Sequence, residues 1–313
     1  MNSKLSERLI KIPVLGWVVK GLQKIRLAPN SDWSLYDLLE LYIIGIVQGA
    51  LTSRAGAIAF SLFMAIFPLL IFLITLLPFI VPYVPVDDFE AQFLQFIHAA
   101  FPGDSGNYLV SVFEEIQLQN QSGLLSTTFL LTLFLFANGV SAILSAFENS
   151  YHVRLTRNFF KQYLVSLFLG LLIALFIIVA AVAYVCIKFY TMRILTKLDY
   201  SGSEYTVITI IQIFVIPLSI YIFTSLIYFF GTKEGLKGGF FNWGAVMTTA
   251  LFMATFYFFG IYLDNFSSYN KLYGTLGSLL ALMLFIWLNS TILLLGFELN
   301  ATIKEIKRTP NKS

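Results

Sequence analysis

Long apolar stretches without any charged residue dominate the chain and alternate with short polar segments. Six of these stretches each exceed the roughly 20 residues that an α-helix needs to cross the hydrocarbon core of a bilayer. The pattern therefore predicts an all-α fold, a polytopic membrane helix bundle with six transmembrane helices. After trimming for turn residues, these helices are expected at residues 57–82, 124–147, 163–187, 206–231, 240–262 and 274–298.

The segment before the first predicted crossing, residues 1–53, has amphipathic character. Apolar residues recur at helical spacing within 14–25 and are flanked by basic ones, which is typical of a helix lying on an anionic membrane surface. A second helix is predicted over 35–50, with Asp32 or Ser34 as its N-cap. Its uncharged part is too short to span a bilayer, so we expect it at the interface or packed on the bundle.

The run 83–123, between the first two predicted crossings, contains no Lys or Arg but six acidic residues. Apolar residues recur at helical spacing on both sides of Pro102 and Gly103. This pattern predicts an external two-helix hairpin with its acids toward water. Two roles remain open for the hairpin: a lid over a cavity, or a packed ectodomain without a gating role.

Lys and Arg residues are shared unequally between the two predicted sides of the membrane. Sixteen of the 20 lie in residues 1–56, the loops after the second and fourth helices, and the C-terminus. Because basic residues accumulate in cytoplasmic loops, both termini are expected in the cytoplasm. The chain then divides into an amphipathic cytoplasmic segment, a six-helix transmembrane domain with the external hairpin inserted, and a basic cytoplasmic tail. Their ranges are 1–53, 54–301 and 302–313.

Composition narrows the functional classes. With 58% hydrophobic and 12% charged residues, the chain departs from soluble domains, in which roughly 25% of residues are charged. The basic loops account for the net charge of +3 without a nucleic-acid-binding face. His98 and His152 are predicted on opposite sides of the membrane, and no nucleotide-binding or soluble catalytic motif is present. We expect no metal site, no cofactor, no nucleic-acid partner and no enzymatic activity.

Two prolines fall inside predicted transmembrane helices, Pro68 in the first and Pro217 in the fourth. A proline within a helix frees a backbone carbonyl and bends the helix. The eight residues that begin at each proline resemble each other, and the two helices are predicted to run in opposite directions. This agrees with a 3+3 inverted repeat around a binding site, and ordinary proline kinks are the alternative.

Charged residues gather near the predicted cytoplasmic ends of the helices. Arg54 opens the first helix, Glu148 closes the second, Arg157 follows it closely, and Glu298 lies at the end of the sixth. Ionisable groups at a membrane boundary pair with one another or line a polar cavity. The cluster is therefore a candidate gate or proton-linked site, with structural ion pairing or snorkelling as the alternative.

Four further residues are candidates for lining a cavity. Asn138, Gln212 and Asn289 are predicted at depth in the second, fourth and sixth helices, where amides bond across helices or bind a ligand. Trp287 is expected near the middle of the sixth helix, either packed in the bundle or facing a cavity.

Several motifs follow one another along the chain: AIAFS at 57–61, FPLL at 67–70, ENSYHV at 148–153 with Arg157 after it, NKLYGTLG at 270–277, Trp287, and LGFELNA at 295–301. In their order and spacing, these motifs resemble the YihY/BrkB family of bacterial inner-membrane proteins. Phe60 stands where members commonly have Tyr, and Phe297 where Ala is common. The resemblance implies a six-helix protein of the bacterial cytoplasmic membrane. Names used in the family include virulence factor BrkB and ribonuclease BN, and suggested roles include envelope biogenesis and lipid export.

Taken together, these features predict transport or accommodation of an amphiphilic envelope component, such as a lipid or glycolipid precursor, by alternating exposure of an intramembrane cavity. The alternative is a non-transporting membrane scaffold for envelope biogenesis. The expected partners are membrane lipids and envelope-biogenesis proteins. Ribonuclease activity is not expected, because no cytoplasmic segment carries a metal cluster or an acid/base pair for RNA hydrolysis.

Overall fold

The computed structural model describes most of the helical part of the chain. The described residues are 13–26, 33–80, 91, 94–95, 110–111, 122–150, 152–153, 156–197, 204–233, 235–236, 239–265 and 275–308. Within them, the regular elements are α-helices, and one isolated bridge joins Arg26 to Ser34. The predicted external hairpin at 83–123 falls, apart from a few isolated positions, outside the described residues.

Six long helices correspond to the six predicted crossings. They are α4 (Leu51–Ile80), α7 (Ser122–Glu148), α8 (Phe159–Lys197), α9 (Glu204–Gly231), α10 (Trp243–Asn265) and α12 (Thr275–Arg308). In the described part of the chain, four helices are long and apolar enough to cross a membrane, and a fifth span is formed if a bent helix pair counts as one. The predicted all-α membrane bundle is confirmed, and six exact spans stay a prediction.

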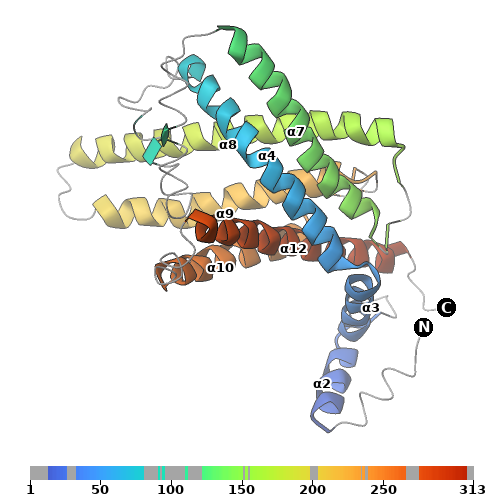
Figure 1. Cartoon of the computed structure of the whole chain (residues 1–313). Helices are drawn as coiled ribbons and strands as arrows, with labels where there is room; N and C mark the ends of the chain where they lie inside the picture. Colours follow the sequence, from blue (N-terminus) through green and yellow to red (C-terminus); the bar gives the residue numbers. More distant parts are fainter. Residues whose placement is uncertain are drawn as a thin grey trace.

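The six long helices pack in a closed ring. Each contacts the next in chain order, from α4 to α7, α8, α9, α10 and α12, and α12 returns to pack on α4. In Figure 1, α8, α9, α10 and α12 run alongside one another, while α4 and α7 cross the view together at a steep angle to them. The first and last long helices of the chain therefore meet, and their contact closes the ring.

Two shorter helices precede the ring, α2 (Pro13–Lys24) and α3 (Leu35–Gln48). Ser34 is the N-cap of α3, as predicted: its side chain accepts from the backbone N–H of Asp37, and Asp37 accepts in return from the backbone N–H of Ser34. The helix ends at Gln48, slightly before the predicted residue 50, and the chain bends by 60° into α4. Ala50 takes a positive φ of 48° at this break. The bend lets α3 pack on α12.

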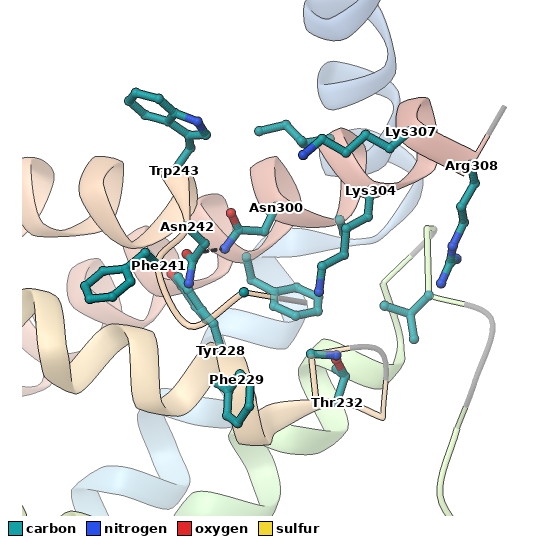
Figure 2. A pocket seen from close by; sticks show the side chains of 16 residues that line it. Tyr228, Phe229, Thr232, Phe241, Asn242, Trp243, Asn300, Lys304, Lys307 and Arg308 are labelled. Carbon is teal, nitrogen blue, oxygen red and sulfur yellow. Dashed lines mark hydrogen bonds between the residues drawn. The ribbon is translucent and has the colours of Figure 1, made fainter. Parts of the chain in front are cut away.

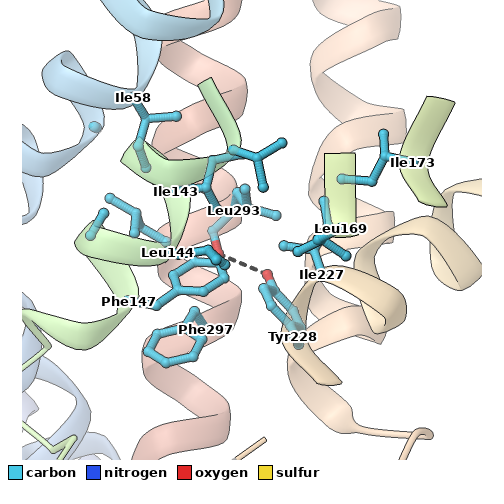
Figure 3. Packing of buried hydrophobic residues seen from close by; sticks show 14 of the residues in the cluster. Ile58, Ile143, Leu144, Phe147, Leu169, Ile173, Ile227, Tyr228, Leu293 and Phe297 are labelled. Carbon is cyan, nitrogen blue, oxygen red and sulfur yellow. Dashed lines mark hydrogen bonds between the residues drawn. The ribbon is translucent and has the colours of Figure 1, made fainter. Parts of the chain in front are cut away.

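Three aromatic side chains fill the interior of the ring near the end where α7 and α9 finish (Figure 3). The ring of Phe147 stacks on that of Phe297, with centroids 4.1 Å apart and planes 5° apart. Tyr228 lies 5.7 Å from Phe147 and 6.1 Å from Phe297, measured between ring centroids. Its hydroxyl donates to the carbonyl of Leu293 at 2.7 Å and lies 2.6 Å from the hydroxyl of Thr248. We call Phe147, Tyr228 and Phe297 the aromatic cluster.

Helices α10 and α12 approach closely because glycines lie where they touch. A methyl group at Gly296 would overlap the hydroxyl of Thr248 and crowd the hydroxyl of Tyr228. A methyl group at Gly244 would overlap the carbonyl oxygen of Gly296. Small residues commonly permit such close packing of membrane helices. These two glycines therefore set the distance between α10 and α12.

Replacing Gly296 with alanine should loosen this contact. Because the added methyl group meets α10 rather than open space, Gly296→Ala is expected to lower the free energy of unfolding by about 1–3 kcal/mol. Thermal unfolding of the detergent-solubilised protein measures the effect. Gly260→Ala on α10 is the matched control, since nothing lies within 4 Å of a methyl group there. Equal stability of the two variants would contradict the role assigned to Gly296.

Candidate functional site

A buried ion pair joins the first and last helices of the ring. The guanidinium Nη2 of Arg54, on α4, lies 2.6 Å from Oε1 of Glu298, on α12, and the side chains are 8% and 0% exposed. Nη1 of Arg54 donates to the carbonyl of Ala146 near the end of α7, at 2.8 Å. The hydroxyl of Ser150 donates to the second carboxylate oxygen of Glu298, also at 2.8 Å. One arginine and one glutamate thus tie together α4, α7 and α12.

A second ion pair lies beside the first. Nη1 of Arg157 lies 3.3 Å from Oε1 of Glu148, and both side chains are buried. The same guanidinium donates to the carbonyls of Phe230 and Gly231 at the end of α9, at 3.0 and 2.7 Å. Burial lowers the pKa of the Arg157 guanidinium, and the neighbouring Glu148 carboxylate opposes that shift. The Arg157–Glu148 pair fastens α9 to the end of α7.

These two pairs form the ion-pair cluster, composed of Arg54, Glu298, Glu148 and Arg157, and the end of the bundle that carries it is called the ion-pair end. The similar depth predicted for Arg54, Glu148 and Glu298 stays a prediction, and the contacts add that Arg157 pairs with Glu148. The pairing itself shows that Arg54 contacts Glu298 rather than Glu148. Whether the cluster gates transport or only holds the helices stays a prediction.

Helix α3 covers the Arg54–Glu298 pair from outside the ring. A methyl group at Gly45 would lie 2.8 Å from Nε2 of His152 and 3.3 Å from Oε2 of Glu298, so glycine makes room for both. A methyl group at Gly49 would lie 2.7 Å from Nη2 of Arg54. The hydroxyl of Tyr42 donates to the carbonyl of Leu295 at 3.2 Å and holds α3 on α12. Water is thereby displaced from the pair.

Ser150 and His152 were not among the predicted site residues, although both are buried at the cluster. Nε2 of His152 lies 3.2 Å from the carbonyl oxygen of Leu41 on α3. Both residues belong to the ENSYHV motif at 148–153, which carried part of the family resemblance. That motif was the available signal, but only the fold places its serine against Glu298.

An apolar cavity of about 290 Å³ lies inside the ring. Every one of the six long helices contributes to its wall. Representative lining residues, one from each helix in chain order, are Ala65, Phe136, Ile173, Ile227, Phe252 and Leu293. The polar side chains in the wall are those of Asn289 and Ser290 on α12, and both donate to carbonyls one turn earlier in their own helix. The cavity therefore suits an apolar ligand.

Of the residues that the sequence predicted to line a cavity, some line this space and others do not. Asn289 lines the cavity, and its amide donates to the carbonyl of Phe285 in its own helix at 2.7 Å. Trp287 is half-buried and packs against the core beside the cavity. Asn138, on α7, and Pro217, on α9, are half-buried.

Pro68 and Gln212 fall within the bounds of α4 and α9, and their side chains lie outside the described part of the structure. The inverted repeat suggested by Pro68 and Pro217 stays a prediction. In the described residues, no group of three or more His, Cys, Asp or Glu side chains could hold a metal ion.

The Arg54–Glu298 pair predicts a measurable coupling. Removing one partner leaves a buried charge without its counter-charge, so Glu298→Gln is expected to lower the free energy of unfolding by about 3–5 kcal/mol. The double variant Arg54→Gln/Glu298→Gln should lose clearly less than the sum of the two single variants. Thermal or denaturant unfolding in detergent measures all three.

The control for this prediction is Glu305→Gln, which removes a carboxylate 3.9 Å from Arg308 in a partly exposed pair on the same helix. Such pairs contribute about 0–1 kcal/mol. Additive losses in the double variant would exclude a structural ion pair. A Glu298→Gln variant that is as stable as the native protein but inactive in lipid movement would support the gating interpretation.

Comparison with known proteins places the chain in a family. The model of the family described as virulence factor BrkB matches residues 45–313. A ribonuclease-like protein, YfkH of Bacillus subtilis (strain 168), is 26% identical over 266 residues, covering 83% of this chain and 93% of that protein. No solved structure matches. The matched region contains the whole ring of helices, and this chain, a multi-pass membrane protein, belongs to the BrkB family.

Proposed function

We propose that this protein lies in the bacterial cytoplasmic membrane with both termini in the cytoplasm. It accommodates the apolar part of an envelope lipid or glycolipid precursor inside its ring of helices and moves that lipid between leaflets. The orientation is supported by the sixteen basic residues on one predicted side of the membrane. The ion-pair end is then the cytoplasmic end.

The apolar cavity is the observation that carries this proposal. Interiors of helix bundles are normally packed without voids much larger than a water molecule, whereas this ring retains a space of about 290 Å³ that is partly open to the outside of the bundle. Sites for small ligands usually measure roughly 300–1,000 Å³. The cavity is therefore large enough for part of an acyl chain and too small for a whole lipid, whose remainder must extend between helices.

A second candidate function is supported by the packing at the ion-pair end. The aromatic cluster and the two ion pairs close that end of the ring, as a rigid membrane scaffold for envelope-biogenesis proteins would require. A scaffold does not need lipid movement, whereas a transporter must open this end. Lipid movement by the purified protein therefore separates the two functions.

The test reconstitutes the full-length protein in vesicles with fluorescent lipids and follows the fraction that becomes accessible from the opposite leaflet. The native protein should move lipid faster than protein-free vesicles do. Ala65→Phe fills the cavity and should slow movement by about tenfold or more, a change of ~1.4 kcal/mol in the barrier. Ala57→Phe makes the same substitution at an exposed position of α4 and should leave the rate unchanged.

Asn289→Leu serves as a second cavity variant if Ala65→Phe lowers the yield of folded protein. Native protein that moves no lipid would contradict transport and favour the scaffold. Equal rates for native protein and a folded Ala65→Phe variant would remove the cavity from the mechanism. The proposal includes no catalytic step, so the same preparation should not hydrolyse RNA, despite the ribonuclease-like name of the Bacillus relative.

A further inference from the structure

A second and larger cavity lies between the α9–α10 connection and the last turns of α12 (Figure 2). It measures about 580 Å³, and the described residues that line it include three basic side chains and no Asp or Glu. The basic residues are Lys304, Lys307 and Arg308. In Figure 2, Lys304 extends from α12 toward the α9–α10 connection, and Arg308 extends toward the segment that follows α7. We call this space the basic cavity, and its charge favours an anionic ligand.

The other walls of the basic cavity are apolar or neutral. Aromatic rings are contributed by Tyr228, Phe229, Phe241 and Phe297. The amide of Asn300 donates to the side-chain oxygen of Asn242 at 2.7 Å, and its own oxygen accepts from the backbone N–H of Gly244 at 2.8 Å. These bonds hold Asn242 and the first turn of α10 against α12. The ligand of the basic cavity should combine a negative charge with an apolar part.

The cavity lies at the depth expected for lipid headgroups. At about 1.5 Å per residue, the 34 residues of α12 measure roughly 51 Å, well beyond the ~30 Å hydrocarbon thickness. Lys304 and Arg308 lie in the last two turns of this helix. At the rim, Phe241 and Trp243 are 78% and 71% exposed, as aromatic residues at a membrane interface are. Basic pockets between membrane helices at this level suit anionic headgroups.

The two cavities are neighbours along the same helices. On α9, Ile227 lines the apolar cavity and the next residue, Tyr228, lines the basic one. On α12, Leu293 lines the apolar cavity, and Phe297, one turn later, lines the basic one. The aromatic cluster lies between the two spaces. A phosphate held by the basic residues would therefore place its acyl chains beside the cluster that separates them from the interior of the ring.

We propose that the basic cavity binds the phosphate group of an anionic membrane lipid. The inference rests on the proposed function and deepens it, because it names phosphate-bearing lipids as the substrate class. Arg308, whose Nη1 lies 3.9 Å from the carboxylate of Glu305 in a partly exposed pair, supplies a planar guanidinium suited to two phosphate oxygens, and the two lysines supply compact charges. The apolar walls receive the first part of the acyl chains.

Compensation of the helix dipole is the simplest alternative for these basic residues. Lys307 and Arg308 lie in the last turn of α12, where cations stabilise a helix end. Lys304 lies one turn earlier, and it lines the cavity. Dipole compensation gives no reason for this placement and predicts no preference among lipids.

Lipid binding can be read from Trp243 at the rim of the cavity. The full-length protein is placed in vesicles that contain brominated phosphatidylglycerol or, separately, brominated phosphatidylcholine. Bromine atoms on the lipid quench tryptophan fluorescence, and the part of the quenching that is lost in the Trp243→Phe variant comes from this site. Phosphatidylglycerol should quench more strongly than phosphatidylcholine. The preference of the site for phosphatidylglycerol over phosphatidylcholine should fall by about fivefold for each basic residue removed. The variants are Lys304→Gln, Lys307→Gln and Arg308→Gln, made singly and together as a triple variant.

A matched control removes a lysine elsewhere. Lys161→Gln takes an exposed lysine from the first turn of α8, which does not line the basic cavity, and should retain the preference. Lys304→Gln alone is used if the triple variant unfolds. Equal quenching by both lipids, or an unchanged preference in a folded Lys304→Gln variant, would overturn the proposal. Displacement of the lipid by inorganic phosphate would assign the site to a soluble phosphate compound and would overturn the lipid assignment.

The binding experiment is at equilibrium and does not need lipid movement. Ala65→Phe should therefore retain the preference for phosphatidylglycerol while it slows movement. Native protein that binds but moves no lipid would contradict the proposed transport and leave the basic cavity as a lipid site. Native protein that moves lipid without a preference at Trp243 would contradict only the inference about the basic cavity.

Discussion

The ring of helices is closed by one buried ion pair between residues 244 positions apart in sequence, Arg54 and Glu298. Charges are costly to bury unless they are paired and hydrogen-bonded, so this pair is compatible with the interior only while α4, α7 and α12 are together. The carbonyl of Ala146 and the hydroxyl of Ser150 complete the hydrogen bonding of the pair. Helix α3 covers it, which the bend after Gln48 and the small residues Gly45 and Gly49 make possible.

Closure of the ring creates the space that the proposed function uses. Each long helix packs mainly on its two neighbours in the ring, and contacts across the ring, such as Phe147 of α7 on Phe297 of α12, fill the centre only in part. Near the ion-pair end, Phe147, Tyr228 and Phe297 pack against one another, while farther along the ring about 290 Å³ stays open. The basic cavity lies on the other side of the same aromatic cluster. The apolar cavity, the aromatic cluster and the basic cavity therefore follow one another along α9 and α12.

Much of the fold was predictable because it depends on local pattern. The six long helices lie close to their predicted ranges, and Ser34 caps α3 as expected. Differences occur where a helix continues past its apolar stretch: α8 extends beyond the predicted residue 187 to Lys197, and α12 extends beyond the predicted residue 298 to Arg308. Charged residues can continue a helix outside the hydrocarbon, so hydropathy alone does not mark these ends. The site was predictable only as a set of charges at similar depth, and not as specific pairs.

The sequence by itself determined the membrane class, the approximate helices and the asymmetry of basic residues. Each of these depends on transfer of local segments between water and lipid, and a segment carries that information alone. Tertiary structure decided that Arg54 pairs with Glu298, that Asn289 bonds within its own helix, and that Lys304 lines a cavity beside Tyr228. These outcomes depend on which helices become neighbours and how closely glycines such as Gly296 let them approach. In a chain whose helices are almost equally apolar, hydropathy does not distinguish one neighbour from another, so packing makes the choice.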